Sequence, residues 1–587
     1  MGILGINISH DGTLSFVQNG KHIFSLAEER ILRKKAFLGF PFSTLRYIID
    51  NGILDPEEVD CVAVAVDAFP VTMAETFSFL LTENKSYYDL QNDEKPKWFY
   101  NSDATWVKIS TESKCQEYVQ AKISALLADC GINASIEFHN HHLCHAASAY
   151  YSSGLEDKKV LAITMDGEGD GLSASVNICE NGKIQVLSQT QRKDSAGNIY
   201  SAVTKFCGFK VSRHEGKITG LAAYGDSEKA YKFFSKYIFV RDGKLCIDGL
   251  KNLNIFQKIR NKILYFFGFK VLVAYDELVS RCGDISYKDL SAGIQTLLEE
   301  RISEIVAYWI DHTGVRDLVL AGGVFANVKF NQKISELDCV DSLYVYPDMG
   351  DGGLAYGAAM LSDVNYTRFD PKISKLRDVY LGPEFTDEDV KVCIANDPEI
   401  VANLSNDIAR ESAVLIANKK ILGWFQGRME YGPRSLGNRS ILATPVDANI
   451  NKWLNERLKR TEFMPFAPSC LYESSDRLFD IPKESLKRAA EFMTITFKVK
   501  EAWLDKVPAV IHVDNTARPQ LVKKATNPAF YELLIEFEKL TGLPLVVNTS
   551  FNSHEEPIIC HPNEAINALK RGIIDVLAIG NYVVRRK

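Results

Sequence analysis

Two histidines four residues apart are the strongest chemical signal in this chain. In the segment HNHHLCHAASAYY, His141 and His145 would share one face of a helix, where both imidazoles can bind a single metal ion. His139 and His142 lie close by, so the spacing leaves open which pair would act as ligands. Histidines at this spacing are also common on helices that bind no metal.

Acidic residues at the ends of two apolar segments favour a metal site. Asp166 follows the apolar run AITM, and Asp351 follows the segment YVYPDMG. Ligands of α/β folds collect at the carboxyl ends of strands, where both aspartates are expected. Two imidazoles with two carboxylates would suit Fe(II), Zn(II) or Mn(II), and the residue types do not choose among them.

Glycine-rich segments predict a nucleotide site. DGEGDG, HEGKITGLAAYG and AGGVFANVKFN each follow a predicted strand, and glycine lets the backbone approach a phosphate closely. None of them matches the Walker A or dinucleotide fingerprints, and glycines also serve simply to make tight turns. Lys217, in the second segment, could neutralise a phosphate group or be an ordinary solvated lysine.

A segment rich in arginine, glycine and proline predicts a second phosphate site. GWFQGRMEYGPRSLGNRSILATP contains Arg434 and Arg439, and Lys459, Arg518 and Asn548 lie in later turn-rich motifs. Arginines in rigid loops offer planar, forked donors to phosphate. The alternative, an ordinary basic surface, is disfavoured because these charges lie beside apolar strands rather than along a helix face.

The order of the expected strands indicates a duplicated α/β fold. The segment ILGINISHDGTLSFVQNGKHIFSLAEER predicts a three-stranded meander with turns at Asp11-Gly12 and Asn19-Gly20. VLAITMDGEGDG and SASVNICENGKIQVLSQT repeat this pattern around Asn181-Gly182. Apolar residues from Ile294 to Trp309 predict a long amphipathic helix that leads into the strand DLVLAGG. We expect a nucleotide to bind between the two halves.

Composition narrows the class of protein. A chain of 587 residues is too long for one core, so at least two domains are expected, with a polar linker near residues 362–377. The net charge of −7 and the lack of basic tracts disfavour nucleic acid as a partner, and no apolar run could span a membrane. The twelve cysteines form no C-x-x-C pair, which disfavours a zinc ribbon. A cytoplasmic enzyme fits best.

The apolar, basic run Lys251–Tyr275 could touch a membrane, but an inserted pair of helices is the favoured interpretation.

Together these segments resemble the NodU/CmcH O-carbamoyltransferase family. The resemblance covers nearly the whole chain and rests on the motifs SHDG, AEERILRKK, HHLCHAASAYY, MDGEGDG, EGKITGLAAYG, AGGVFAN, GDGGLAYGAA, QGRMEYGPRSLGNRSILATP, MPFAPS, TARPQ and NTSFN. It implies an actin-like ATPase domain over residues 1–366, as in the tRNA threonylcarbamoyladenosine transferases. It also implies a YrdC-like α/β domain over residues 367–587.

The resemblance implies an ATP-dependent O-carbamoyltransferase. Carbamoyl phosphate and ATP, with Mg²⁺, would form carbamoyl-adenylate in the C-terminal domain. The N-terminal domain would then pass the carbamoyl group to a hydroxyl of a small acceptor, such as a sugar, an antibiotic or another secondary metabolite, and release AMP. The acceptor itself is not indicated, and a homodimer is compatible with the pattern.

The resemblance also implies roles for individual residues. His141, His145, Asp166 and Asp351 match metal ligands, with Fe(II) favoured, and His10 and Lys35 match catalytic residues near the acceptor hydroxyl. The adenylate loops match Gly167, Gly169, Lys217, Gly322, Gly323 and Asn327. The carbamoyl phosphate and ATP site matches Arg434, Arg439, Lys459, Arg518 and Asn548. Relatives often carry histidine after the residue that matches Lys35, whereas this chain has Ala36.

Three other functions compete with this one. A tRNA-modifying transferase would share the first domain, but the net negative charge disfavours it. The hydrogenase-maturation carbamoyltransferase would share both domains, but its C-x-x-C zinc motifs and acylphosphatase module have no counterpart here. A nucleotide-binding regulator without enzymatic activity would be distinguished by a lack of AMP release with hydroxyl acceptors.

Overall fold

The computed structural model describes residues 1–69, 81, 111–155, 158–249, 272–367, 370–395, 397–459 and 463–587. The chain forms two compact units, Met1–Leu376 and Arg377–Lys587, so the division lies beyond the boundary expected after residue 366. Most of the apolar run Lys251–Tyr275, up to residue 271, lies outside the described residues. Its last four residues form the start of helix α12 (Leu272–Ser280).

The first half of the N-terminal unit contains a five-stranded sheet. A meander of β1 (Gly2–Asn7), β2 (Thr13–Gln18) and β3 (Lys21–Ala27) extends through β4 (Cys61–Val64) and β5 (Ser135–Phe138) in the order β3-β2-β1-β4-β5. Within the meander the strands are antiparallel, whereas β4 is parallel to both β1 and β5. Asn19 and Gly20 have φ of 51° and 77°, as a two-residue hairpin turn requires.

The second half repeats this arrangement. Its sheet has the order β12-β11-β6-β7-β8, which places an antiparallel meander beside two parallel strands as in the first sheet. The strands are β6 (Val160–Gly169), β7 (Leu172–Glu180), β8 (Lys183–Gln191), β11 (Asp317–Ala321) and β12 (Ser342–Val345). The duplication predicted from the hairpin motifs is therefore confirmed by topology.

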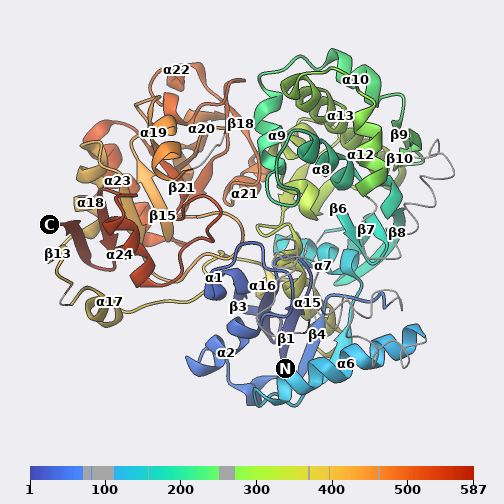
Figure 1. Ribbon diagram of the computed structural model, residues 1–587, viewed down its shortest axis with the longest axis horizontal. Helices are drawn as coiled ribbons and strands as arrows, with labels where there is room; N and C mark the ends of the chain where they lie inside the picture. The colour runs from blue at the N-terminus through green and yellow to red at the C-terminus, as the bar shows by residue number, and fades with distance from the viewer. Residues whose placement is uncertain are drawn as a thin grey trace. The chain divides into compact units, whose positions relative to one another are not determined.

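Two helices pack between the sheets of this unit. Helix α15 (Leu354–Tyr366) packs on β1, β2 and β4, whereas α7 (His141–Ser153) packs on β6 and β11, and the two helices pack on each other (Figure 1). Glycines permit this close approach. A Cβ on Gly357 would lie 1.9 Å from the backbone oxygen of Cys144, and a Cβ on Gly5 would lie 1.9 Å from that of Ala355.

Helix α13 (Tyr287–Thr313) is the long amphipathic helix predicted from sequence, and it packs against α9 (Glu215–Ala222) and α10 (Glu228–Phe234). The other elements of this unit are α1 (Glu28–Leu32), α2 (Phe42–Asp50), η1 (Pro56–Glu58), α6 (Glu112–Ala128), η4 (Arg192–Asp194), α8 (Ala196–Phe206), β9 (Ile238–Arg241), β10 (Lys244–Ile247), η6 (Gly323–Ala326), α14 (Val328–Ser335), η7 (Asp351–Gly353) and α16 (Pro371–Ser374).

The C-terminal unit is built on an eight-stranded mixed sheet. Its order is β13-β23-β22-β14-β15-β21-β16-β20. The strands are β13 (Ile400–Leu404), β14 (Leu422–Phe425), β15 (Arg439–Ala443), β16 (Ala467–Leu471), β20 (Gln520–Val522), β21 (Leu545–Ser550), β22 (Val576–Ile579) and β23 (Tyr582–Arg586). Helices α18 (Ile408–Ala417) and α23 (Pro528–Thr541) pack on each other, and α24 (Pro562–Lys570) packs on β14, β22 and β23.

The smaller elements of the C-terminal unit include a three-stranded sheet of β17 (Phe479–Asp480), β18 (Phe497–Val499) and β19 (Thr516–Ala517). The remaining elements are α17 (Asp387–Ile394), α19 (Ile450–Arg457), η8 (Tyr472–Ser474), α20 (Ser475–Leu478), η9 (Glu484–Leu486), α21 (Lys487–Ala490), α22 (Glu501–Leu504) and η10 (Pro508–Val510).

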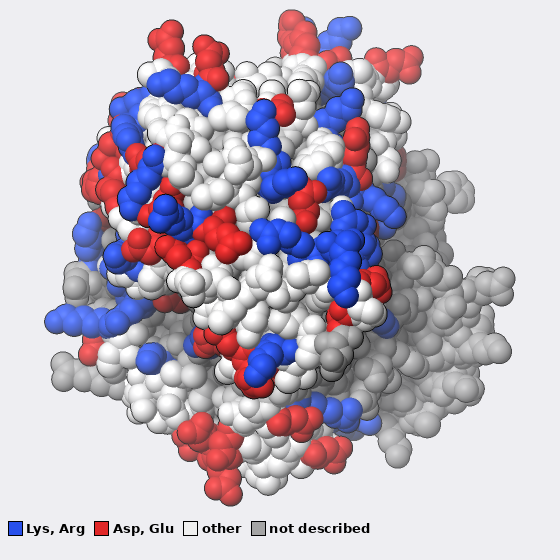
Figure 2. All heavy atoms as spheres, turned by 90° about the vertical axis from the view of Figure 1, so that its left-hand side faces the viewer, with Lys and Arg blue, Asp and Glu red and all other residues white. Residues whose placement is uncertain are grey.

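On the face shown in Figure 2, Lys and Arg side chains are intermixed with Asp and Glu. Among the helices of the described residues, none is both long enough and apolar enough to cross a membrane. All twelve cysteines are free thiols in this structure.

Candidate metal centre and substrate sites

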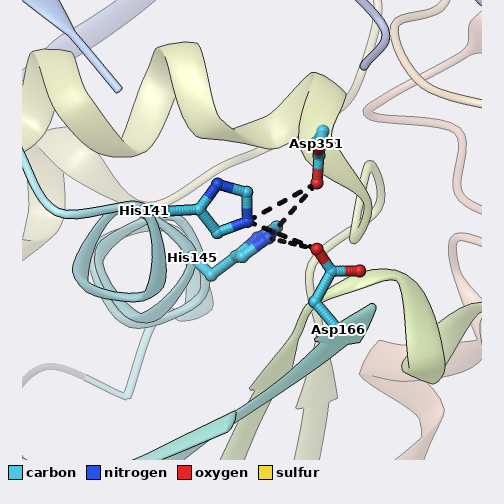
Figure 3. A group of neighbouring side chains, drawn as sticks. All are labelled: His141, His145, Asp166 and Asp351. Atoms are coloured by element: carbon cyan, nitrogen blue, oxygen red, sulfur yellow. Dashed lines mark hydrogen bonds and ion pairs between the residues drawn. The ribbon is translucent and has the colours of Figure 1, made fainter. Parts of the chain in front are cut away.

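Helix α7 carries the two histidines predicted to bind a metal ion. It begins after Asn140, whose side-chain oxygen accepts a hydrogen bond from the backbone N–H of Leu143 at 3.2 Å. Residues four apart lie on the same face of a helix. The imidazoles of His141 and His145 accordingly point toward one space at the amino-terminal end of α7 (Figure 3).

Two aspartates reach this space from the second half of the unit. Asp166 lies near the carboxyl end of β6, and Asp351 begins the turn that precedes α15. Oδ2 of Asp166 lies 3.3 Å from Nε2 of His141 and 3.9 Å from Nε2 of His145. Oδ1 of Asp351 lies 3.7 Å and 3.6 Å from the same two nitrogens. One ligand atom from each residue lies within 4.8 Å of all the others.

The residues of this cluster fit a divalent cation. His145 has no exposed surface, and neither of its ring nitrogens has a hydrogen-bond partner within the described part of the chain. Leaving a buried polar atom without a partner is costly, and a metal ion would satisfy one of these nitrogens. Two carboxylates and two neutral imidazoles would also balance the charge of the ion.

The cluster without a metal ion retains a proton on an imidazole. Burial by itself lowers the pKa of His141, but the negative charges of Asp351 and Asp166 outweigh it and raise the pKa to about 9. Burial acts in the opposite direction on Asp166, yet its hydrogen bond with His141 and the nearby imidazoles lower its pKa well below the ordinary value. Metal ligands must be deprotonated, so a bound cation would displace this proton.

The other two histidines of the motif have partners outside the cluster. Nε2 of His139 lies 2.7 Å from the hydroxyl of Ser362, and Nδ1 of His142 lies 2.8 Å from the hydroxyl of Thr164. Burial lowers the pKa of His142 to about 3, so this residue is neutral. The ambiguity that the sequence left among the four histidines is thereby resolved in favour of His141 and His145.

Gly169 makes room for the His141 imidazole. A Cβ at position 169 would lie 2.2 Å from Cγ and Cδ2 of that ring. The sequence predicted that this glycine belongs to an adenylate-binding loop. The structure instead places it against His141 of the candidate metal cluster, and any side chain here would displace that imidazole.

Replacing Gly169 by alanine is therefore expected to weaken metal binding by roughly 10–100-fold, the range typical of changes next to a ligand. Isothermal titration of the metal-free protein with Zn²⁺ or Mn²⁺ would measure the change. Gly216→Ala is a matched control, because a Cβ there would meet open space. An unchanged affinity in Gly169→Ala would show that His141 is not a ligand.

The predicted nucleotide loops lie beside the metal cluster. The backbone N–H of Gly323 donates to Oδ1 of Asp166 at 3.2 Å, and Gly322, with φ of 103°, donates to the backbone oxygen of Met349 at 2.6 Å. The backbone oxygen of Gly167 accepts a hydrogen bond from the Asn198 side chain at 2.9 Å. Asp166 therefore belongs both to the metal cluster and to the glycine loops.

Two further residues predicted to bind adenylate are buried or half-buried in the helical layer. Nδ2 of Asn327 donates to Oε1 of Gln295 at 2.8 Å, and its Oδ1 accepts the backbone N–H of Lys329, so it caps α14. Lys217 lies in α9, is only 5% exposed, and places its ammonium group 5.4 Å from the ring centre of Phe209.

His10 is half-buried in the turn between β1 and β2. The side-chain amide of Asn7 donates to the backbone oxygen of His10 at 2.6 Å and to that of Asp351 at 2.9 Å. The hydroxyl of Ser9 donates to Oδ2 of Asp351 at 3.1 Å. The turn that carries His10 is thus tied to Asp351 of the candidate metal cluster. Sequence reasoning missed Asn7 and Ser9, although both flank His10 in the motif NISHDG.

Lys35 lies in the loop that follows α1. Burial raises the pKa of Asp11, the residue after His10, and the charge of Lys35 opposes this rise. Ala36 has φ of 54°, and its N–H donates to Oε2 of Glu29 at 2.8 Å. Ala36 is therefore a buried residue in a left-handed conformation.

The C-terminal unit gathers three of the segments predicted to bind phosphate. Nδ2 of Asn548, on β21, donates to the backbone oxygen of Ser435 at 3.2 Å and to Oε1 of Gln520 at 3.1 Å. Ser435 follows Arg434, and Gln520 lies two residues beyond Arg518. Lys459 is exposed, with φ of 54°, just after α19.

Arg439 has a different environment from Arg434. Arg439 has no exposed surface and donates to the backbone oxygens of Gln426, Gly427, Asn438 and Pro383 at 2.7–3.3 Å. Beside it, Oε1 of Glu430 accepts three backbone N–H groups of the same loop at 2.7–3.3 Å. The structure therefore places Arg439 inside the loop, whereas Arg434 is half-exposed on it.

The fold and these sites define an α/β protein with a histidine–aspartate cluster in a duplicated N-terminal unit. Two family models match the chain: "Carbamoyltransferase N-terminus" over residues 2–360 and "Carbamoyltransferase C-terminus" over residues 413–586. The chain belongs to the carbamoyltransferase family, and it is a carbamoyltransferase enzyme.

Similar proteins cover most of the chain. Nodulation protein NolNO of Sinorhizobium fredii is 30% identical over 98% of this chain and 79% of its own length. Nodulation protein NolO of Bradyrhizobium diazoefficiens is 34% identical over 76% of this chain and 79% of its own length. The uncharacterized protein MJ1051 of Methanocaldococcus jannaschii is 31% identical over 100% of this chain and 99% of its own length. The solved structure of full-length HypF in a phosphate- and nucleotide-bound form matches 63% of this chain and 56% of its own, with 12% identity. Its TM-score of 0.34 is too low for the likeness to indicate a shared function.

Proposed function

We propose that this carbamoyltransferase is ATP-dependent and carbamoylates a hydroxyl group of a small acceptor. The main support for this proposal is the metal cluster, in which ligand atoms of His141, His145, Asp166 and Asp351 lie within 4.8 Å of one another. A divalent cation bound there, with Fe(II) favoured, would polarise the carbonyl of an activated carbamoyl group. We assign this transfer to the N-terminal unit, as an actin-like domain, and adenylate formation to the C-terminal unit, as a YrdC-like domain.

The first reaction would activate the carbamoyl group. Water would hydrolyse carbamoyl phosphate to carbamate and phosphate. The carbamate oxygen would then attack the α-phosphorus of Mg²⁺–ATP, giving carbamoyl-adenylate and pyrophosphate. Arg434, Arg518 and Lys459 would neutralise phosphate charge, while the buried Arg439 would support the loop that carries Arg434. Asn548 is 2% exposed, and its Oδ1 has no partner among the described residues, so it could accept a hydrogen bond from a carbamoyl NH₂ group.

The second reaction would transfer the carbamoyl group. The acceptor oxygen attacks the carbonyl carbon, the bond from that carbon to the adenylate oxygen breaks, and AMP leaves with the electron pair. Backbone groups of Gly167, Gly322 and Gly323 would hold the adenylate, with Lys217 and Asn327 in the adjoining helical layer. His10 would accept the proton of the acceptor hydroxyl, and Lys35 would orient the acceptor.

Release of AMP in proportion to carbamoylated product tests this function. Purified protein, carbamoyl phosphate, Mg²⁺–ATP and a panel of sugars and other polyhydroxylated acceptors should yield one AMP, one pyrophosphate and one carbamate ester per turnover. Product mass and AMP would be measured together. Product formed without ATP would overturn the adenylate route. If the protein binds ATP but releases no AMP with any acceptor, a regulatory function would be favoured instead.

Replacing His10 by asparagine is expected to slow the transfer by roughly 10²–10⁴-fold, the usual contribution of general-base catalysis. A neutral imidazole is suited to accept a proton near pH 7, whereas an amide is not. Metal content and pyrophosphate release should stay normal, because neither depends on this proton. A near-normal transfer rate at saturating acceptor would exclude His10 as the base.

A further inference from the structure

Asp170 occupies a hairpin turn next to the metal cluster, but its side chain bonds away from that turn. Oδ2 accepts the backbone N–H of His141 at 2.7 Å, the backbone N–H of Asp67 at 3.2 Å and the side-chain amide of Asn140 at 3.4 Å. Oδ1 accepts the backbone N–H of Ala68 at 3.2 Å. One carboxylate thus holds the first residue of α7, the residue before it, and the chain that leaves β4.

These bonds join the two halves of the N-terminal unit. Residues 67–68 and α7 follow strands of the first sheet, whereas Asp170 belongs to the β6–β7 hairpin of the second. The metal cluster is divided in the same way, since both histidines come from the first half and both aspartates from the second. We propose that Asp170 is a positioning residue, which fixes the amino-terminal end of α7 so that His141 and His145 face Asp166 before any metal ion binds.

Turn chemistry alone does not explain an aspartate at this position. Asp170 and Gly171 have φ of 48° and 79°, a conformation that asparagine or aspartate followed by glycine adopts readily. The corresponding turns at Asn19-Gly20 and Asn181-Gly182 use asparagine, whereas the turn at Asp242-Gly243 uses aspartate, so the turn conformation accepts either residue. What aspartate adds is a second acceptor oxygen and a negative charge, and the amino-terminal end of a helix favours both.

Asp170→Asn therefore separates the role of this residue in the turn from its role in holding the end of α7. The substitution keeps the turn but removes the negative charge and one acceptor oxygen. Asp242→Asn is the matched control, since Asp242-Gly243 forms the same turn, with φ of 49° and 66°, and the Asp242 side chain is exposed. The experiment is titration of the metal-free proteins with Co²⁺. It measures the dissociation constant and the visible absorption spectrum, which reports the ligand geometry, and thermal unfolding monitors the fold.

We expect Asp170→Asn to bind Co²⁺ roughly 10–100-fold more weakly, as is typical when a group that orients a ligand is lost. Its spectrum should differ from that of the wild type, while Asp242→Asn should match the wild type in both. Asp170→Ala should show a larger loss, and if that variant does not fold, Asp170→Asn alone decides. Wild-type affinity and an unchanged spectrum in Asp170→Asn would overturn the inference.

The inference rests on the proposed metal centre, and a fourth variant, His141→Ala, tests that centre separately from the role of Asp170. If His141→Ala also binds Co²⁺ like the wild type, the metal centre itself is misplaced and the proposed function loses its main support. If His141→Ala loses Co²⁺ while Asp170→Asn retains it unchanged, the centre stands and only the role of Asp170 is refuted.

Discussion

Replacing His141 by alanine is expected to remove bound metal and abolish carbamoylation of the acceptor, while pyrophosphate release continues. The imidazole is 3.3 Å from Asp166 and 3.7 Å from Asp351, so its loss leaves three of four ligand groups around the ion. Because His141 itself would bind the ion, the loss of affinity should exceed the roughly 10–100-fold typical of residues that only orient a ligand. Adenylate formation should persist because we assign it to the other unit.

Elemental analysis of the purified variant, together with separate assays for pyrophosphate and for carbamoylated product, would check this prediction. His139→Asn is the matched control: it changes a histidine two residues away whose ring bonds to Ser362 outside the cluster. Full metal occupancy in His141→Ala would rule out the proposed ligand set. Loss of pyrophosphate release together with the metal would instead refute the division of labour between the units.

Replacing Arg434 or Arg518 by alanine is expected to stop carbamoyl-adenylate formation, and added carbamoyl-adenylate is expected to restore transfer. A hydrogen bond to a charged group contributes about 1.5–3 kcal/mol, so each such bond lost would slow the first reaction by roughly 10–100-fold. An arginine can donate two parallel bonds to a phosphate, and losing both would bring the reaction nearly to a stop. The metal centre in the other unit should be unaffected, which is why the supplied intermediate should still be used.

Pyrophosphate release and transfer from synthetic carbamoyl-adenylate would be measured for each variant. Arg410→Ala, which changes an exposed arginine on α18, should behave like the wild type in both assays. Arg439→Lys should differ from Arg434→Ala by lowering the unfolding temperature, because the Arg439 guanidinium bonds to backbone oxygens within its loop. Failure of the adenylate to rescue Arg434→Ala would contradict the two-site scheme.

The sequence by itself determined the features that depend on neighbours along the chain. Helical geometry guarantees that His141 and His145 share a face, and Asn-Gly or Asp-Gly turns fix the hairpins that begin each half. The strand-end position of Asp166 follows from the apolar run before it. These local signals, and the motifs that resemble the family, were enough to predict the duplicated fold, the four clustered residues and carbamoyl transfer.

The tertiary structure decided what depends on residues far apart in sequence. It paired His139 with Ser362 and His142 with Thr164, which left only His141 and His145 to face the aspartates. It also placed Gly169 against an imidazole and the Asp170 carboxylate on the end of α7. Motif spacing does not encode such contacts, because they depend on how separate elements pack. A carboxylate in a turn can bond to its own turn or to another element, and only packing brings that other element within hydrogen-bond distance.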